Sequence, residues 1–331
     1  MQNIWLSVLI PVYNVEKYLA CCINSVLSQD CSGVEIILLN DCSTDSSLVE
    51  AKKLQDQSPE LVRIVEHEEN RGLSAARNSL LEHATGEYVW YFDSDDLLLD
   101  GAIASLAKVS DAHSPDCIMF DYFRISEASK YPSSINKISK RVSTFVGPEN
   151  VLMEDKARLF EGMFLGRRLH AWSRIIKREV LLNSQRYPEG KYFEDVYTIP
   201  MISLNFKNYY YLQKALFGYR IRKDSIVRTP TLKKIDDMAK GPLGVYEKWC
   251  DSGVEFKLKH RYAFVKFCAM NFVNTIKMLK DSGLYNRARR KEYRELFLKG
   301  NNISFFEFAW MSFLRRDFAC FYRFILYNNF K

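Results

Sequence analysis

The first hundred residues alternate between short apolar runs and amphipathic stretches, and this alternation restricts the fold more than any other feature. Apolar runs occupy residues 4–10, 34–39, 61–66 and 87–92, and a helical pattern follows each of them. Strands that are apolar throughout must be covered on both faces, which happens when helices connect parallel strands. The sequence therefore predicts an α/β fold with a doubly wound, mostly parallel sheet.

A polar cluster follows each of the four runs, and the four clusters are Pro11-Val12-Tyr13-Asn14, Asn40–Asp45, Asn70–Asn78 and Asp93-Ser94-Asp95-Asp96. Ligands of α/β sheets bind beyond the carboxyl ends of the strands, so we expect one site along a single edge. Carboxylates one residue apart, such as Asp93 and Asp95, can share Mg²⁺ or Mn²⁺, which prefer oxygen ligands and substrate phosphates. Taken alone, the acidic tetrad also fits a solvated turn or a helix N-cap.

In this order, the four clusters resemble those of glycosyltransferase family 2, the inverting nucleotide-sugar transferases with the GT-A fold. Family members typically read Pro-x-Tyr-Asn, Asn-Asp-x-Ser-x-Asp, Asn-x-Gly-x-x-x-Ala-Arg-Asn and Asp-x-Asp-Asp, and this chain matches all four. The resemblance covers residues 4–225 and is strongest over 4–100. It implies transfer of a sugar from a nucleotide-sugar, with a UDP-sugar as the expected donor, in bacterial polysaccharide biosynthesis.

The resemblance also implies how the donor is held. The expected donor-binding residues are Pro11, Val12, Tyr13, Asp41, Arg71, Asp93, Ser94 and Arg222. Residues 11–13 form a strand-end turn with free backbone groups for the base, and Asp41 would accept a hydrogen bond from a uracil N–H. The alternatives are an Asx turn or helix N-cap for Asp41 and a surface position for Arg71.

Asp93 and Asp95 are the metal ligands that the resemblance implies, with Asp95 binding directly. Many relatives supply a further ligand from a late Tyr-x-x-His segment, but here Tyr219 is followed three residues later by Arg222. This departure suggests that Arg222 or Lys223 pairs with the diphosphate itself. Arg77 and Asn78 are interpreted equally well as donor contacts or as braces for the Asp-x-Asp loop.

Glu194 and Asp195 resemble the acidic pair that supplies the catalytic base in this family. A carboxylate at the start of a helix can take the proton from an acceptor hydroxyl as it attacks. We assign the base to Asp195 and a supporting role to Glu194, with a helix-capping pair as the alternative. Trp172 is expected either to stack on an acceptor sugar or to pack in the core.

Residues 229–331 are expected to form a mainly helical region after the transferase domain of residues 1–228. Residues 231–331 contain 20 Lys and Arg against 10 Asp and Glu, whereas residues 1–230 are slightly acidic. The last thirty residues carry eleven aromatic side chains interleaved with Arg315, Arg316 and Arg323. Such a segment fits a helix lying on an anionic membrane or, equally, one packing on its neighbours. Nucleic-acid binding is not expected, because the sequence contains no recognisable RNA- or DNA-binding module.

No signal peptide and no apolar run of spanning length is evident, which predicts a cytoplasmic protein, peripheral on the inner face of the cell membrane. The expected partners are a nucleotide-sugar and a saccharide or lipid-linked saccharide acceptor. A catalytically silent subunit that scaffolds a polysaccharide-assembly complex is the alternative function. The intact carboxylate set argues against it.

Overall fold

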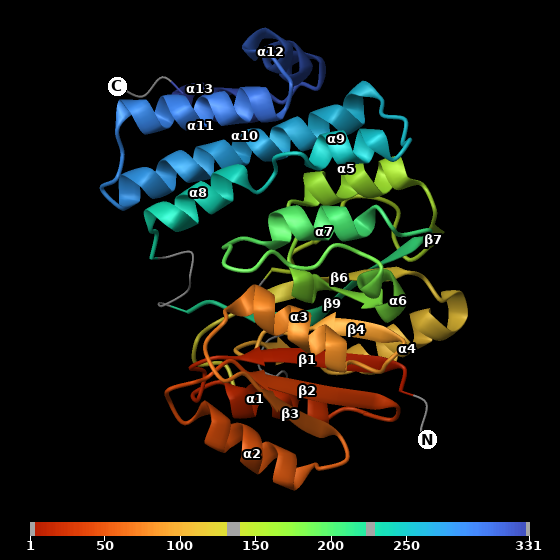
Figure 1. The fold of residues 1–331 in the computed structure, drawn as a ribbon. Helices are drawn as coiled ribbons and strands as arrows, with labels where there is room; N and C mark the ends of the chain where they lie inside the picture. Colours follow the sequence, from red (N-terminus) through yellow and green to blue (C-terminus); the bar gives the residue numbers. More distant parts are fainter. Residues whose placement is uncertain (1–3, 131–139, 223–228, 329–331) are drawn as a thin grey trace.

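The computed structural model describes residues 4–130, 140–222 and 229–328, which fold around a large central sheet (Figure 1). The strand order is β3-β2-β1-β4-β8-β6-β9-β5, with β7 pairing with β9. The strands are β1 (Leu6–Val12), β2 (Val34–Asn40), β3 (Val62–Glu66), β4 (Tyr88–Tyr91), β5 (Leu97–Leu98), β6 (Cys117–Ile125), β7 (Leu152–Met153), β8 (Arg174–Lys177) and β9 (Tyr209–Arg220).

Helices cover both faces of the sheet and continue beyond it. They are α1 (Leu19–Leu27), α2 (Ser47–Gln57), α3 (Leu73–His83), α4 (Ala102–His113), α5 (Lys156–Gly166), α6 (Arg178–Leu182), α7 (Asp195–Ser203), α8 (Leu232–Lys240), α9 (Val245–Asp251), α10 (Leu258–Asp281), α11 (Arg287–Gly300), α12 (Phe305–Leu314) and α13 (Phe318–Asn328), with a short 3₁₀ helix η2 (Ala171–Ser173).

The sheet separates two cores. Side chains on β1 alternate between them: Val8 and Ile10 pack with α1, α2 and α4, whereas Leu9 packs with α3. This period of two is the geometry of an extended strand, and both faces are apolar because both are covered. The α/β fold class predicted from the apolar runs is confirmed.

The sheet is parallel through β3, β2, β1 and β4, and mixed beyond that point. β8 joins β4 and β6 in antiparallel directions, whereas β6 and β9 are parallel. The sequence pattern of residues 149–183 predicts helix, and this prediction is partly wrong, because β8 lies within that range. α5 ends at Arg167, whose φ of 57° is left-handed, and Ile175 and Ile176 are both buried within the sheet. β-branched residues buried on opposite faces favour a strand.

Helices α8 to α13 stack on α5 and α7 at the end of the molecule remote from β3 (Figure 1). The core on the α3 side of the sheet continues through α5 and α10 into these helices, and Phe272 of α10 contacts Phe324 of α13 with ring centroids 5.4 Å apart. The boundary at residues 228 and 229 stays a prediction. Within the described ranges, no helix has both the length and the apolar character needed to cross a bilayer.

Candidate active site

A buried guanidinium joins three carboxylates from two distant parts of the chain. Arg77, on α3, is 2% exposed and lies 2.5 Å from Glu194, 3.2 Å from Asp195 and 3.4 Å from Asp93. Asp93 follows β4, whereas Glu194 and Asp195 begin α7. We call these four residues the Arg77 cluster. The structure thus brings together the predicted metal-binding motif and the predicted base.

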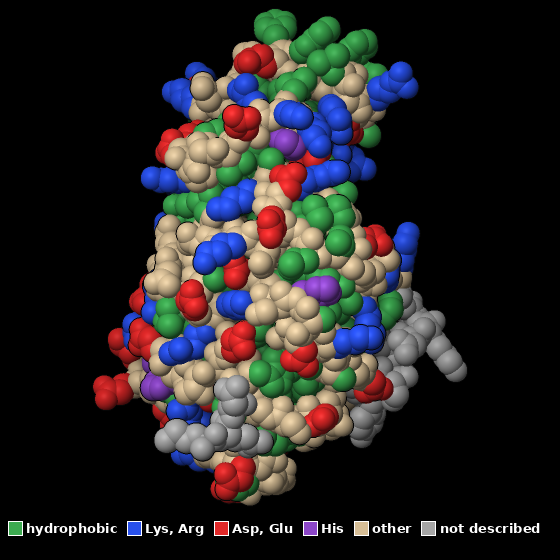
Figure 2. Space-filling view, turned by 90° about the vertical axis from the view of Figure 1, so that its right-hand side faces the viewer, with side chains coloured by type: hydrophobic (Ala, Val, Ile, Leu, Met, Phe, Trp, Pro, Cys, Tyr) green, Lys and Arg blue, Asp and Glu red, His purple; other side chains and the backbone are tan. Residues whose placement is uncertain are grey.

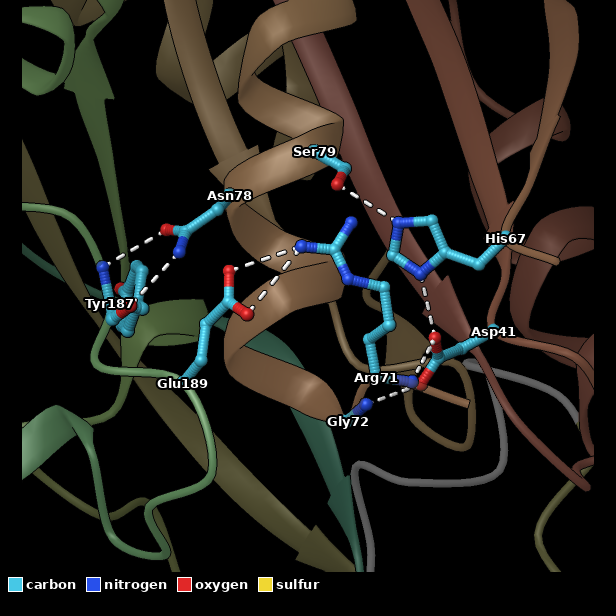
Figure 3. A network of polar contacts seen from close by, with 8 residues as sticks. All are labelled: Asp41, His67, Arg71, Gly72, Asn78, Ser79, Tyr187 and Glu189. Carbon is cyan, nitrogen blue, oxygen red and sulfur yellow. Dashed lines mark hydrogen bonds and ion pairs between the residues drawn. The ribbon is translucent and has the colours of Figure 1, made fainter. Parts of the chain in front are cut away.

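Asn78, the next residue on α3, fixes this helix to the loop between α6 and α7. Asn78 exchanges two hydrogen bonds with the backbone of Tyr187, at 2.9 and 3.0 Å (Figure 3). The ring of Tyr187 lies under the Arg77 guanidinium, 5.2 Å from its centroid. The bracing interpretation matches Arg77, which contacts Asp93 of the Asp-x-Asp loop, whereas Asn78 braces the chain at Tyr187 instead.

Asp95 and Asp96 contact the end of β9. The Arg222 Nε atom lies 2.6 Å from the Asp95 carboxylate, and the Arg220 backbone N–H donates to Asp96 at 2.6 Å. Arg220 also donates to the Asp95 carbonyl at 2.5 Å. Arg222 therefore lies beside the predicted metal ligand, whereas Lys223 lies outside the described residues.

Asp41 is buried at the end of β2 and binds the start of α3. It accepts hydrogen bonds from the Arg71 and Gly72 backbone N–H groups at 3.0 and 2.7 Å, and His67 lies 2.7 Å away (Figure 3). Gly72 has φ of 83°, a conformation that favours glycine. Asp41 therefore does not form the Asx turn or cap leading into the next helix, because its carboxylate accepts from Arg71 and Gly72, while the Ser43 N–H donates to Asn40 and the Ser47 N–H to Asp45.

The remaining donor-binding candidates lie at neighbouring strand ends. Tyr13 follows β1 and is 46% exposed, while the Val12 carbonyl accepts the backbone N–H of Asp41 at 2.9 Å. Arg71 reaches away from the helix start to Glu189 at 3.3 Å, as Figure 3 shows. The strand-end turn predicted for residues 11–13 is partly wrong, because Pro11 and Val12 belong to β1 and pair with β2, so the chain leaves the strand only at Tyr13. Ser94 is buried between the two metal-ligand candidates.

Burial shifts the ionisation of two carboxylates. It raises the pKa of Asp195 to about 7, against the opposing attraction of Arg77, and Glu194 adds to the rise. It also raises the pKa of Asp95 to about 6, against the attraction of Arg222. A base with a pKa near neutrality is well matched to proton transfer at physiological pH.

Two carboxylates can serve a divalent cation here only together with other ligands. Among the residues that the structure describes, no group of three or more His, Cys, Asp or Glu side chains is arranged to hold a metal ion. Mg²⁺, however, is commonly held by one or two carboxylates plus substrate phosphates and water. Asp93 and Asp95 fit that mode, provided that Arg222 releases Asp95.

Trp172 does not offer its face to a sugar. Its side chain is 3% exposed and lies between Phe217 and His170, with ring centroids 4.4 and 4.7 Å away and near-parallel planes. Its carbonyl accepts the Trp90 indole N–H at 2.8 Å. The acceptor-stacking prediction for Trp172 is therefore wrong, because both ring faces are already covered.

Sequence reasoning missed His67, which links Asp41 to Ser79 on α3 through its two ring nitrogens, at 2.7 and 2.9 Å (Figure 3). It also missed Tyr187 and Glu189, the loop partners of Asn78 and Arg71. Tyr187 and Glu189 lie 109 and 118 positions from their partners, and His67 lies 26 and 12 positions from its own, so no spacing pattern marks any of them.

The fold and the site define a class of protein: an α/β fold in which acidic side chains from strand ends and one helix start meet around a buried arginine. The family model described as "Glycosyl transferase family 2" matches residues 7–181, more than half of the chain. The chain belongs to glycosyltransferase family 2.

Individual relatives agree with this assignment. Glycosyltransferase GlyA of Streptococcus pneumoniae serotype 4 is 32% identical over 235 residues, which are 69% of this chain and 32% of GlyA. The chain thus spans about a third of that relative's length.

Two solved structures share the fold. S. aureus TarS 1–349 in complex with UDP-GlcNAc has a TM-score of 0.59 at 19% identity, covering 95% of this chain and 92% of that one. Mannosyltransferase PcManGT from Pyrobaculum calidifontis, in complex with GDP-Man and Mn²⁺, has a TM-score of 0.52 at 16% identity, covering 90% and 87%.

Replacing Arg77 with Met is expected to destabilise the protein by about 3–5 kcal/mol, because three carboxylates lose their shared cation. The loss of unfolding free energy should be larger at pH 8 than at pH 6. Without the guanidinium the folded-state pKa of Asp195 rises further, so ionisation opposes folding up to a higher pH. Thermal unfolding of both proteins across this range measures the effect.

Arg63→Met is the matched control, since Arg63 is half-exposed and lies 3.8 Å from a single carboxylate, Glu35. It should change the unfolding free energy by less than about 1 kcal/mol at either pH. Equal losses in the two variants would contradict the central role of the Arg77 cluster.

Proposed function

We propose that this protein is an inverting glycosyltransferase that moves a sugar from a nucleotide-sugar, with UDP-sugars as the first candidates, to a hydroxyl of a saccharide or lipid-linked saccharide. The observation that carries the proposal is the Arg77 cluster, which holds the acidic motif after β4 beside the acidic pair of α7. Family membership and two neighbours solved with nucleotide-sugars support it.

Asp195 is the proposed base. Its two carboxylate oxygens contact Arg77 and the Ala171 backbone N–H, both at 3.2 Å, which fixes the side chain in place. The acceptor oxygen attacks the anomeric carbon as Asp195 takes its proton, and the electron pair of the breaking carbon–oxygen bond leaves with the diphosphate. A single displacement of this kind inverts the anomeric configuration.

The donor is proposed to lie along the β1, β2 and β4 ends. Tyr13 and the backbone of residues 11–13 would meet the base, with Asp41 holding the adjoining start of α3 and leaving Oδ2 one further acceptor position. Arg71, Ser94 and Asp93 would face the ribose and phosphates. These assignments rest on the family motifs and on the positions of the side chains.

Asp93 and Asp95 are the proposed ligands of a divalent cation, Mn²⁺ or Mg²⁺, which would offset the negative charge of the departing diphosphate. Arg222 is proposed to move from Asp95 to the diphosphate when the donor binds, since a guanidinium pairs well with phosphate oxygens. The contact of Arg222 with Asp95, one of the proposed cation ligands, at 2.6 Å supports this role.

Peripheral contact with an anionic membrane is proposed for the outer face of α12 and α13. Five aromatic side chains there are more than half exposed: Phe306, Trp310, Phe313, Phe318 and Tyr322. Figure 2 shows hydrophobic side chains at the top of the molecule, where α12 lies in Figure 1. Arg315, Arg316 and Arg323 are exposed on the same two-helix segment. Aromatic rings flanked by arginines suit an anionic lipid interface.

The scaffold alternative is disfavoured by the same geometry. A silent subunit has no need to keep an aspartate with a pKa of about 7 held by two fixed contacts at the start of a helix. Perturbed carboxylates of this kind are typical of working catalytic sites.

Asp195→Asn is expected to lower kcat by about 10²–10⁴, because the amide cannot accept the acceptor proton, while UDP affinity stays unchanged. In the unaltered protein, kcat/KM should fall as the pH drops below about 7, since Asp195 is then protonated. Nucleotide release from a panel of UDP-, GDP- and dTDP-sugars with saccharide acceptors measures both effects. Near-normal turnover by Asp195→Asn would refute the base assignment, and release from no donor would favour the scaffold.

Removing divalent cations with EDTA is expected to abolish turnover, and adding Mn²⁺ or Mg²⁺ should restore it. Asp95→Asn should raise the Mn²⁺ concentration needed for half-maximal activity by at least about tenfold, because one of two protein ligands is weakened. Asp56→Asn on the exposed side of α2 is the matched control. Full activity in EDTA would contradict a role for the metal in catalysis.

Serine replacements at Phe306, Trp310 and Phe313 should reduce binding to anionic phospholipid vesicles by more than about tenfold, because each buried aromatic contributes about 1.5–3 kcal/mol. Serine at Val49, Val146 and Val151, which are exposed elsewhere, is the matched control. Flotation with anionic and neutral vesicles makes the measurement. Equal binding by both variants, or loss of self-association in place of vesicle binding, would contradict the membrane proposal.

A further inference from the structure

A cavity of about 440 Å³ lies outside the donor-binding motifs and is lined chiefly by cations. Its lining residues are Arg124, Lys140, Arg141, Val142, Ser143 and Arg168. Four of these six carry positive charge, and none carries negative charge. We call it the cationic cavity. A concave surface with this lining attracts an anion.

The walls of the cavity come from separate segments held together by the sheet. Arg124 lies near the end of β6, and a β-bridge between Tyr122 and Val142 places residues 140–143 beside that strand. Arg168 follows α5 in the segment that leads to η2. The cations are therefore positioned by the fold rather than by chance proximity along the chain.

Most of this charge is not neutralised by the protein. Arg141 lies 3.3 Å from buried Asp121 and donates to the Gln213 carbonyl at 3.1 Å. In contrast, Arg124, Lys140 and Arg168 form no ion pair with any described residue. The Arg168 Nε atom is buried without a hydrogen-bond partner among those residues, which is costly unless a ligand supplies an acceptor.

The cavity adjoins the proposed base through a short chain of contacts. Arg168 is two residues from His170, and the next residue, Ala171, donates its backbone N–H to Asp195 at 3.2 Å. The His170 ring also meets the Tyr122 ring edge-on, with centroids 6.5 Å apart, and Tyr122 pairs with Val142 of the cavity wall. Burial and the nearby Arg168 lower the pKa of His170 to about 3, so the imidazole stays neutral.

We propose that the cationic cavity binds a phosphate group of the acceptor, so that the attacking hydroxyl is delivered to Asp195 from a phosphate-bearing chain. This inference rests on the proposed function. Guanidinium groups favour phosphate because they donate paired hydrogen bonds to its oxygens. The donor diphosphate is proposed to bind at a different site, at the ends of β1, β2 and β4, since no residue lining the cavity belongs to the donor motifs. The phosphate can belong to a phosphodiester-linked polymer or to a lipid-borne diphosphate.

The test measures acceptor binding directly, without turnover. A short glycerol-phosphate oligomer, a polyprenyl diphosphate in detergent micelles, and a neutral maltooligosaccharide are titrated against the full chain by calorimetry. At least one phosphate-bearing probe should bind, more weakly as salt rises, and the neutral probe should bind much less. Arg124→Gln with Lys140→Gln should weaken that binding by at least about tenfold, because two charge-assisted contacts are lost.

The paired change Arg287→Gln with Lys291→Gln, on the exposed side of α11, removes the same charge and should alter binding less than about twofold. Arg168→Lys keeps the charge and should weaken binding by loss of the paired geometry alone. Whichever phosphate probe binds identifies the source of the phosphate.

The proposal is overturned if neither phosphate probe binds, if the cavity and α11 variants lose equal affinity, or if UDP displaces the bound probe. The last outcome would place the anion in the donor site. UDP binding by the cavity variant, measured by thermal shift, shows that it is folded. Because no step requires sugar transfer, these results are independent of whether nucleotide release supports the proposed function.

Discussion

The buried guanidinium of Arg77 is the interaction on which the site depends. Two aspartates and a glutamate cannot share a small volume when ionised unless a cation lies among them. Arg77 supplies it from α3 and thereby fixes the distance between the turn after β4 and the start of α7. A buried cation paired with several carboxylates is a poor source of net stability, because its desolvation cost is high. Its value here is geometric: the two acidic segments are held in one arrangement before any ligand binds.

The first half of the site could be predicted from the sequence because it follows from strand topology. Parallel strands place their carboxyl ends on one edge, so Tyr13, Asp41 and Asp93 are brought near one another by the order β3-β2-β1-β4 alone. Asp195 could be recognised by its motif, but its contact with Arg77 spans 118 positions of the chain and has no periodicity that reveals it. Asp41 shows the limit of such reasoning. Its carboxylate lies at a strand end, as the motif predicts, but it already accepts hydrogen bonds from the backbone at the start of α3.

The errors share a physical cause. Trp172 and Arg174–Lys177 lie where the sheet changes from parallel to antiparallel, and a strand inserted there needs apolar residues on both faces. A short run such as Arg-Ile-Ile-Lys has too few residues for its period to distinguish helix from strand. Trp172 was similarly ambiguous, because an aromatic that stacks on a sugar and one that packs between Phe217 and His170 have the same sequence context. Only tertiary packing decides between them.

Charge is balanced differently in the acidic site and in the cationic cavity. In the acidic site, Asp93 is paired with Arg77 and Asp95 with Arg222, so each carboxylate has a cationic partner. In the cationic cavity, Asp121 offsets the positive charge only at Arg141. The proposed function therefore makes different demands on the two ligands. A phosphate of the acceptor would meet cations that form no ion pair with a described residue, whereas a divalent cation joining Asp95 to the donor would need Arg222 to move from that carboxylate.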